Sequence, residues 1–171
     1  DNNFLGTPLY TSARAFLQRP AAEALLRAHW NLAKEGRGLL IHDGYRPWYV
    51  TKMFWDGTPV DKHHFVADPS RGSRHNRGAA VDLTLVDAQG QELVMPTPFD
   101  DFGEKAHRSY QQLPPLAIQN RTTLEQAMAK AGFVGMPTEW WHFDFARWQG
   151  YPLDDIPFDV LAEPPKKSAQ P

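Results

Sequence analysis

A length of 171 residues favours a single domain, because one hydrophobic core usually serves about 100–200 residues before a chain divides. Eighteen Lys and Arg residues against twenty Asp and Glu residues give a formal net charge of -2, which argues against a nucleic-acid groove or a polybasic membrane anchor. The sequence has no cysteine, so disulfides, thiolate nucleophiles and Cys-ligated zinc are excluded. Any metal must therefore be bound by His and carboxylates.

No uncharged stretch approaches the roughly 18 apolar residues of a membrane-spanning helix, so we expect a soluble protein. The sequence starts at Asp1 without a Met or an apolar leader, which fits either a cleaved export signal or a trimmed chain. Both the cytoplasm and the periplasm are therefore compatible with it.

The first predicted helix opens at Pro20, because proline fits the first helical position, where its missing N–H would be unpaired anyway. Apolar residues then recur at helical spacing as far as about Glu35: Ala21, Ala24, Leu25, Ala28 and Leu32. A short buried strand at residues 39–41 leads into a turn at residues 43–47, and a short helix is expected from about Trp48 to Trp55.

Residues 56–77 are rich in Gly, Pro, Asp, Ser, Arg and His and predict a long loop, which in a compact domain is commonly functional. The strand predicted at residues 79–86 alternates between a packed side, with residues 81, 83 and 85, and a side that carries Asp82. A hairpin turn at residues 87–90 is expected to lead into another strand at residues 92–95.

The C-terminal part predicts a short helix around residues 104–110 and a longer helix that begins after Thr122. Glu125 follows Thr122 by three positions, as in a capping box, and Gly132 ends the helix. The aromatic segment 138–145 predicts another strand. The tail 162–171 has too few apolar residues to pack and is expected to be disordered.

Two segments combine His and carboxylates: residues 73–82 and residues 139–142. A catalytic zinc site needs three N or O ligands and an open position, while a further carboxylate can act as the base. The residues His75, Asp82, His142 and Glu139 satisfy that requirement. Strict strand alternation would place Glu139 and His142 on opposite faces, so a bulge or kink is required if both serve one site.

Each candidate also has a structural interpretation. A single His or Asp near a strand end is more often a hydrogen-bonded structural group, and Arg46 could pair with a surface carboxylate in its turn. Asp100 and Asp101 are adjacent carboxylates, and either one could point into the site. We interpret three further histidines as non-ligands, and four aromatic residues as sheet core rather than substrate contacts: His63, His64 and His107; Trp140, Trp141, Phe143 and Phe145.

The sequence resembles the VanX-type zinc D-alanyl-D-alanine dipeptidases, within the wider LAS group of metallopeptidases. The group's motif is Ser-x-His-x-x-Gly-x-Ala-x-Asp followed by Glu-x-x-His, and the matching residues are Ser73, His75, Gly78, Ala80, Asp82, Glu139 and His142. The dipeptidase branch is also similar at residues 43–47, 82–85, 99–100 and 139–142. The resemblance extends over about residues 1–145.

The resemblance implies that one zinc ion is bound by His75, Asp82 and His142. It also implies that Glu139 is the general base and that Arg46 stabilises the transition state. By the same similarity, Asp100 would meet the substrate ammonium and Ser73 would hydrogen-bond the dipeptide. We therefore expect a single α+β domain over residues 1–161, with a central antiparallel sheet flanked by helices. The zinc site would lie on the sheet face that carries Asp82.

The activity implied is hydrolysis of free D-alanyl-D-alanine to two D-alanine, in peptidoglycan turnover or glycopeptide resistance in a bacterium. The expected partner is this small dipeptide, with neither nucleic acid nor membrane insertion, and the oligomeric state is open. One alternative is a D,D-carboxypeptidase or endopeptidase that acts on longer wall peptides. Another is a catalytically silent, zinc-stabilised binding module, although a structural zinc would need neither Glu139 nor Arg46.

Overall fold

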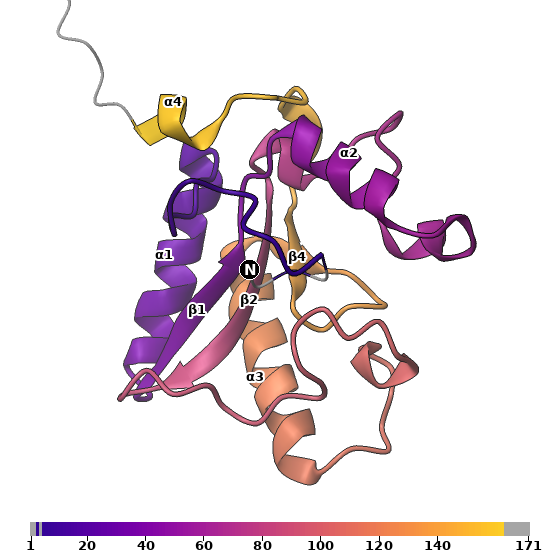
Figure 1. Cartoon of the computed structure of the whole chain (residues 1–171). Helices are drawn as coiled ribbons and strands as arrows, with labels where there is room; N and C mark the ends of the chain where they lie inside the picture. The colour runs from indigo at the N-terminus through magenta and orange to yellow at the C-terminus, as the bar shows by residue number, and fades with distance from the viewer. Residues whose placement is uncertain (1–2, 4, 163–171) are drawn as a thin grey trace, which may run out of the picture.

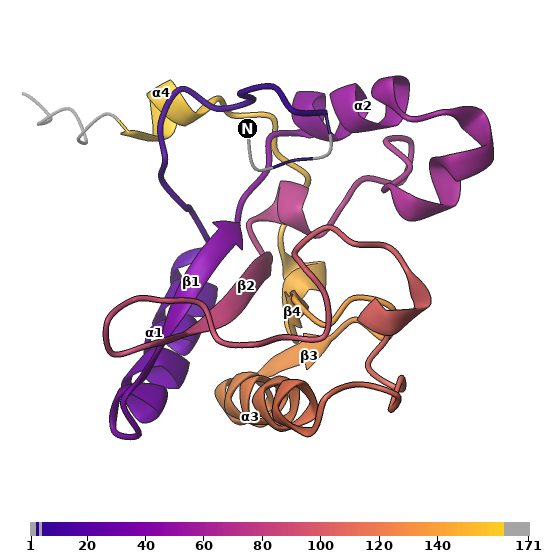
Figure 2. The same ribbon diagram turned by 60° about the horizontal axis from the view of Figure 1, so that its bottom comes forward.

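The computed structural model describes Asn3 and residues 5–162, which form two helices packed on one face of an antiparallel sheet (Figure 1). The sheet has the order β1-β2-β4-β3, with bounds Arg37–Asp43, Ala80–Asp87, His142–Phe145 and Phe133–Gly135. Helices α1, Arg19–Ala33, and α3, Pro115–Ala131, lie side by side beneath it (Figure 2). The predicted α+β class with a central antiparallel sheet is confirmed.

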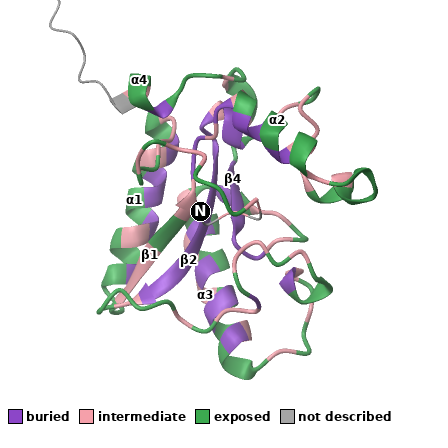
Figure 3. Cartoon of the chain, in the orientation of Figure 1, coloured by how far each residue is buried: buried purple, intermediate pink, exposed green. Residues whose placement is uncertain are grey.

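Strand β2 is the centre of the fold, and its residues from Ala80 to Val86 are all buried (Figure 3). Val81, Leu83 and Leu85 pack into the hydrophobic core together with the inner side of α1, as the alternation predicts. Asp82 lies on the opposite face, where loops rather than helices cover the sheet. The helices therefore supply the core, and the loops enclose the other face.

The elements predicted in the first third of the chain are present. The expected burial of the strand at residues 39–41 is wrong, because β1 is an edge strand and leaves Leu40 and Ile41 exposed. Pro20 lies in the first turn of α1, as proline's missing N–H favours. Helix α2 spans Trp48–Gly57 directly after the predicted turn. The predicted long loop contains two short 3₁₀ helices, Val60–Phe65 and His75–Arg77.

The predicted start of the helix after Thr122 is wrong, because α3 already begins at Pro115. Pro114 and Pro115 start the helix, since proline is tolerated where the first N–H groups have no helical acceptor. The Thr122 hydroxyl donates to the carbonyl of Ile118 inside the helix, so it is no cap. The predicted end is correct: Gly132 has φ 95°, a left-handed conformation that glycine adopts without strain.

Three other predicted elements are shorter than expected. The strand at residues 92–95 is reduced to one bridge between Val86 and Glu92. The helix at residues 104–110 is a 3₁₀ turn, Glu104–Ala106, and the strand at residues 138–145 begins only at His142. The short strand β3 was not predicted.

Beyond β4 the chain forms a 3₁₀ turn, Trp148–Gly150, and the short helix α4, Phe158–Ala162. Of the predicted tail, only Ala162 is described; residues 163–171 lie outside the described residues. Among the helices of the described residues, none is both long and apolar enough to cross a membrane.

Candidate metal centre and active site

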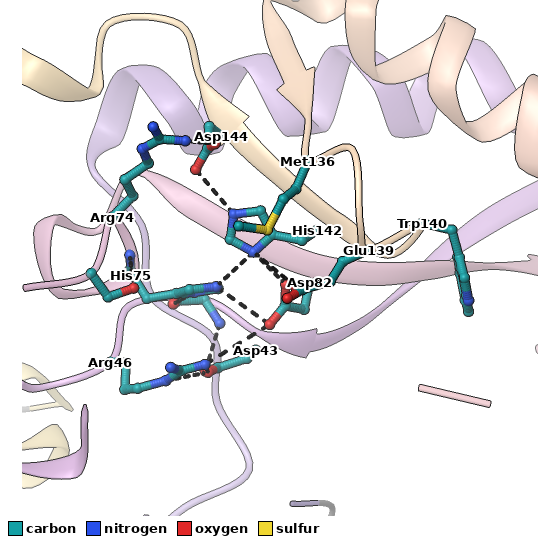
Figure 4. A network of polar contacts seen from close by, with 12 residues as sticks. Asp43, Arg46, Arg74, His75, Asp82, Met136, Glu139, Trp140, His142 and Asp144 are labelled. Atoms are coloured by element: carbon teal, nitrogen blue, oxygen red, sulfur yellow. Dashed lines mark hydrogen bonds and ion pairs between the residues drawn. The ribbon is translucent and has the colours of Figure 1, made fainter. Parts of the chain in front are cut away.

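Three buried side chains meet on the sheet face opposite the helices: His75, Asp82 and His142 (Figure 4). Asp82 and His142 are direct partners in the antiparallel pairing of β2 with β4, so the ladder itself places their side chains together. His75 comes from the 3₁₀ turn before β2. Gly78, at φ 61°, lets the chain turn back into the strand after it.

The nitrogen and oxygen atoms of these three residues have the spacing of metal ligands. His142 Nδ1 lies 2.9 Å from Asp82 Oδ1, and His75 Nε2 lies 3.2 Å from His142 Nδ1 and 3.3 Å from Asp82 Oδ2. Ligand atoms that surround zinc tetrahedrally at its usual bond lengths are about 3.3 Å apart. Within the described part of the chain, no other group of His, Asp and Glu has this arrangement.

The remaining ring nitrogens show which atoms are available to a metal. His75 Nδ1 lies 2.7 Å from the Gly44 carbonyl, and His142 Nε2 lies 3.0 Å from Asp144 Oδ1. Both partners only accept hydrogen bonds, so these two nitrogens carry the protons. In the neutral rings, His75 Nε2 and His142 Nδ1 then each carry a lone pair, and these two nitrogens face each other and the Asp82 carboxylate. A divalent cation satisfies such a set of three acceptors.

In the metal-free protein, protonation of His142 supplies the positive charge that the surrounding acceptors favour. Burial alone would lower the pKa of His142, but its hydrogen bonds to Asp144 and Asp82 raise it to about 10. Burial would likewise raise the pKa of Asp82, but His75 and His142 hold it well below its usual range. The centre is therefore built to surround a cation.

Asp144 supports the metal centre from behind and was missed in the sequence. It accepts from His142 Nε2 and forms an ion pair with Arg74. A carboxylate in this position fixes the tautomer of a ligating imidazole. Asp144 could have been found from the period of two along a strand, because residues 142 and 144 of β4 lie on the same face.

Glu139 lies beside the three candidate metal ligands, with Oε2 4.0 Å from His142 Nδ1 (Figure 4). Strand alternation does not separate Glu139 from His142, because Glu139 lies on the turn before β4 rather than within the strand. Its side chain is 18% exposed. Burial, with a smaller contribution from Asp82, raises the pKa of Glu139 despite the opposing effect of His142.

Arg46 is largely buried, contrary to the interpretation as a surface turn residue. Asp43 Oδ2 accepts from Arg46 Nε at 2.9 Å and lies 2.8 Å from Nη2, while Nη2 is 4.0 Å from Asp82 Oδ2. Asp43 also accepts from Tyr10, and the Asn76 side chain donates to the Arg46 carbonyl. Although burial lowers the pKa of Arg46, Asp43, Tyr10 and Asp82 raise it above its ordinary value.

A cavity of about 1150 Å³ opens onto this centre, and all seven predicted site residues line it: Arg46, Ser73, His75, Asp82, Asp100, Glu139 and His142. Asp100, rather than Asp101, faces the cavity, while Asp101 is exposed and accepts from the Gly103 amide. Burial, followed by the charge of Asp82, raises the pKa of Asp100 to about 7. Ser73 Oγ accepts from the His75 amide at 3.2 Å.

The other histidines lie outside the metal centre, although His64 and His107 line the cavity. His63 contacts the carbonyl of Thr58. The four aromatic residues of the C-terminal segment belong to the hydrophobic core, as predicted. Trp141 additionally forms part of the cavity wall, whereas Trp140 points away from the metal ligands (Figure 4).

Comparison with known proteins identifies the family. The profile of the peptidase M15 family, described as D-ala-D-ala dipeptidase, matches residues 1–160. The chain belongs to this family. It is 37% identical over 163 residues to the D-alanyl-D-alanine dipeptidase of Escherichia coli strain K12, and the match covers 95% of this chain and 83% of that protein.

Two solved structures share the fold. A mutant of the vancomycin resistance D,D-pentapeptidase VanY in complex with Zn(II) has a TM-score of 0.50 and 12% identity, over 82% of this chain and 78% of that one. VanYB in complex with D-alanine-D-alanine has a TM-score of 0.50 and 15% identity, over 84% of each chain. At these identities the likeness concerns the fold alone.

Proposed function

We propose that this M15 peptidase hydrolyses D-alanyl-D-alanine to two D-alanine, with zinc held by His75, Asp82 and His142. The convergence of these three ligands with Glu139 and Arg46 in one cavity carries the proposal. The E. coli relative named D-alanyl-D-alanine dipeptidase supports the choice of substrate, because the match extends over nearly the whole chain.

The ligand set supports zinc as the metal. Two imidazoles and one carboxylate leave a fourth position open, as in catalytic zinc sites. The related fold of VanY is found in complex with Zn(II). Zinc bound in such a site acts as a Lewis acid toward the peptide carbonyl and lowers the pKa of water.

Glu139 is the residue proposed to move protons. As a carboxylate it accepts a proton from the attacking water, whose oxygen bonds to the carbonyl carbon. The same carboxyl then donates this proton to the leaving amine as the C–N bond breaks, and two molecules of D-alanine result. The raised pKa of Glu139 makes the carboxyl a stronger base at neutral pH than an exposed glutamate.

The proposed roles of Arg46, Asp100 and Ser73 follow from the charges and polar groups of the substrate. The Arg46 guanidinium, held by Asp43, faces the negative charge that develops on the carbonyl oxygen. Asp100 pairs with the free ammonium of the dipeptide, and Ser73 hydrogen-bonds the substrate. Both line the same cavity as Glu139.

A D,D-carboxypeptidase or endopeptidase is the second candidate, favoured by one observation. A cavity of about 1150 Å³ is larger than a dipeptide requires. Asp100 favours the dipeptidase, because an acylated substrate has no ammonium to offset this half-buried carboxylate. A silent binding module is disfavoured, because it would need neither Glu139 nor Arg46.

We further propose that residues 1–161 form one catalytic domain, which the family match over residues 1–160 supports. Peptidoglycan precursor turnover and glycopeptide resistance both use removal of D-Ala-D-Ala, and a bacterial setting follows from the relatives. The compartment is proposed to be either the cytoplasm or the periplasm.

Release of D-alanine from D-Ala-D-Ala by the zinc-loaded protein tests the proposal. The Glu139→Gln variant should turn over about 10²–10⁴ times more slowly. It should still bind zinc, since the three ligands are unchanged. A wall pentapeptide that ends in D-Ala-D-Ala is the parallel substrate. Cleavage of the pentapeptide alone would identify a carboxypeptidase, and turnover of neither substrate would refute the proposed function.

A further inference from the structure

The turn that carries Glu139 lies outside the sheet ladder. Within residues 136–141, the Met136 amide donates to the His142 carbonyl at 3.1 Å, and the Glu139 amide reaches the Met136 carbonyl at 3.4 Å. These contacts leave the carbonyls of Pro137 and Trp140 without a partner inside the turn. Trp140 is buried, and because buried carbonyl groups are almost always paired, its carbonyl needs a partner from elsewhere in the fold.

Arg108 supplies that partner. Its Nε donates to the Met136 carbonyl at 2.8 Å, and its Nη2 donates to the carbonyls of Trp140 and His142 at 3.0 and 2.9 Å. Its backbone amide donates to the Pro137 carbonyl at 2.9 Å. One residue therefore holds four carbonyls, two on each side of Glu139.

The surroundings of Arg108 hold the guanidinium in one place. Its side chain is only 10% exposed and its guanidinium carbon lies 4.3 Å from the centre of the Phe143 ring. Nη1 lies 3.8 Å from Glu125 of α3. Burial lowers the pKa of Arg108 to about 10, so the group still carries its charge at neutral pH. A charged, planar fork of donors is suited to bridge several carbonyls at once.

Arg121 of α3 connects this contact to the helix layer. Its Nη1 donates to the carbonyls of His107 and Tyr110, which flank Arg108 in sequence. The segment that carries Arg108 is thereby anchored to a helix. Arg108 in turn links that helix to the turn of Glu139.

We propose that Arg108 is a positioning residue for the hydrolysis, which fixes the turn that aims Glu139 into the cavity. The inference rests on the proposed role of Glu139 as the base. Asp82 and His142 are placed by the pairing of β2 with β4, and Arg108 contacts His142 at its backbone carbonyl rather than at its ring. Displacing Arg108 therefore lowers kcat while the metal ligands stay in place. Misplacement of a reacting group by about 1 Å can reduce the rate by about a hundredfold.

Gly135→Ala displaces Arg108 without removing any polar group. A Cβ at Gly135 would overlap the Arg108 guanidinium, which is the far end of a flexible side chain and can move aside. The fold should therefore survive. Gly150→Ala is the matched control, because a Cβ there meets no heavy atom within 4 Å. For Gly135→Ala we expect a loss of about ten- to a hundredfold in kcat, with KM and zinc affinity near wild type. Gly150→Ala should match wild type throughout.

Arg108→Ala provides an independent test by chemical rescue. Added guanidinium ion should restore part of the lost kcat, because it can occupy the vacated site and donate to the same carbonyls. A variant that was merely destabilised would instead lose activity in guanidinium, which is a denaturant. Arg108→Lys should not restore kcat, because a compact ammonium cannot span carbonyls on both sides of the turn.

Amide hydrogen exchange separates this inference from the proposed function. In Gly135→Ala and Arg108→Ala, exchange should accelerate in residues 136–141 and remain slow in β2. If the wild type releases no D-alanine, the proposed function fails, but exchange still tests the contact with the turn. Wild-type kcat in both variants, or loss of zinc in parallel with kcat, would overturn the positioning role.

Discussion

Asp82 and His142 face each other across the β2–β4 ladder, whereas Glu139 and Arg46 lie on turns that precede β4 and α2. Backbone pairing sets the position of the first two side chains. The other two depend on side-chain hydrogen bonds, from Arg108 to the carbonyls around Glu139 and from Arg46 to Asp43. Substitutions of Asp82 and His142 should therefore act on metal binding, whereas substitutions of Glu139 and Arg46 should act on turnover with the metal retained.

Asp82→Ala should have the largest effect in the ladder. It removes the only carboxylate of the three-residue metal group and leaves two imidazoles, so we expect loss of stoichiometric zinc and no detectable D-alanine release. Zinc content after dialysis and a D-alanine assay measure both effects. Thr84→Val is the control, on the same face of β2 two residues away. The Thr84 hydroxyl is buried without a hydrogen-bond partner, so its removal should leave zinc and activity intact.

Arg46→Met tests the expectation that residues on the turns affect turnover rather than metal binding. The loss of a charged donor that faces the developing oxyanion is expected to lower kcat by about 10²–10³-fold, while the zinc content stays at wild type. Arg46→Lys should recover only part of this loss, because a lysine cannot reproduce the two contacts with Asp43. Arg27→Met, at an exposed position of α1, is the control. Loss of zinc in Arg46→Met would contradict the division between ladder and turn.

The same division explains which features could be predicted from the sequence. The period of two identified β2 and placed Asp82 on the face opposite residues 81, 83 and 85. Motif spacing selected His75, Asp82, His142 and Glu139, and the resemblance to VanX-type dipeptidases added Arg46, Ser73 and Asp100. All seven of these residues line the cavity. Local patterns sufficed because the ladder turns a sequence position directly into a place on one face of the sheet.

The long-range contacts that hold the turns could not be predicted in this way. Asn76 contacts the turn of Arg46 from 30 residues away, and Arg108 contacts the turn of Glu139 from 28 residues away. No local period records such contacts. The start of α3 failed for a related reason: Asn120 and Arg121 are buried in its first turns, so the apolar stripe that marks a helix begins only later.

Asp144→Ala should weaken the ladder site without abolishing it. Without the carboxylate, His142 loses the acceptor that fixes its tautomer, and we expect zinc affinity to fall about 10–100-fold. Asp144→Asn retains an oxygen acceptor and should lose less. Competition with a chelator measures the affinity, and saturating zinc should restore most of kcat. A loss of kcat that zinc cannot restore would show that Asp144 acts on catalysis directly.

Asp100→Asn should have the smallest effect and tests a residue that lies on a separate turn, away from those of Glu139 and Arg46. Asp100 has φ 62°, a conformation that asparagine also tolerates, so the backbone should be unchanged. Loss of the partner for the substrate ammonium should lower kcat/KM by about tenfold. Burial raises the pKa of Asp100, so in the wild type kcat/KM should also fall as the pH is lowered and this carboxylate becomes protonated. Asp101→Asn, at the exposed neighbouring position, should change neither quantity.

The stability of the zinc-free protein provides the second measurement on Asp100. Its pKa of about 7 in the folded state exceeds the value of about 4 in an unfolded chain, so its ionisation opposes folding. This penalty is absent below about pH 4, grows from there to pH 7 and is complete at higher pH. The free energy of unfolding of Asp100→Asn should therefore exceed that of the wild type above pH 7, by at most about 4 kcal/mol. The two curves should converge near pH 4, and a constant difference across the range would show that the carboxylate is not the cause.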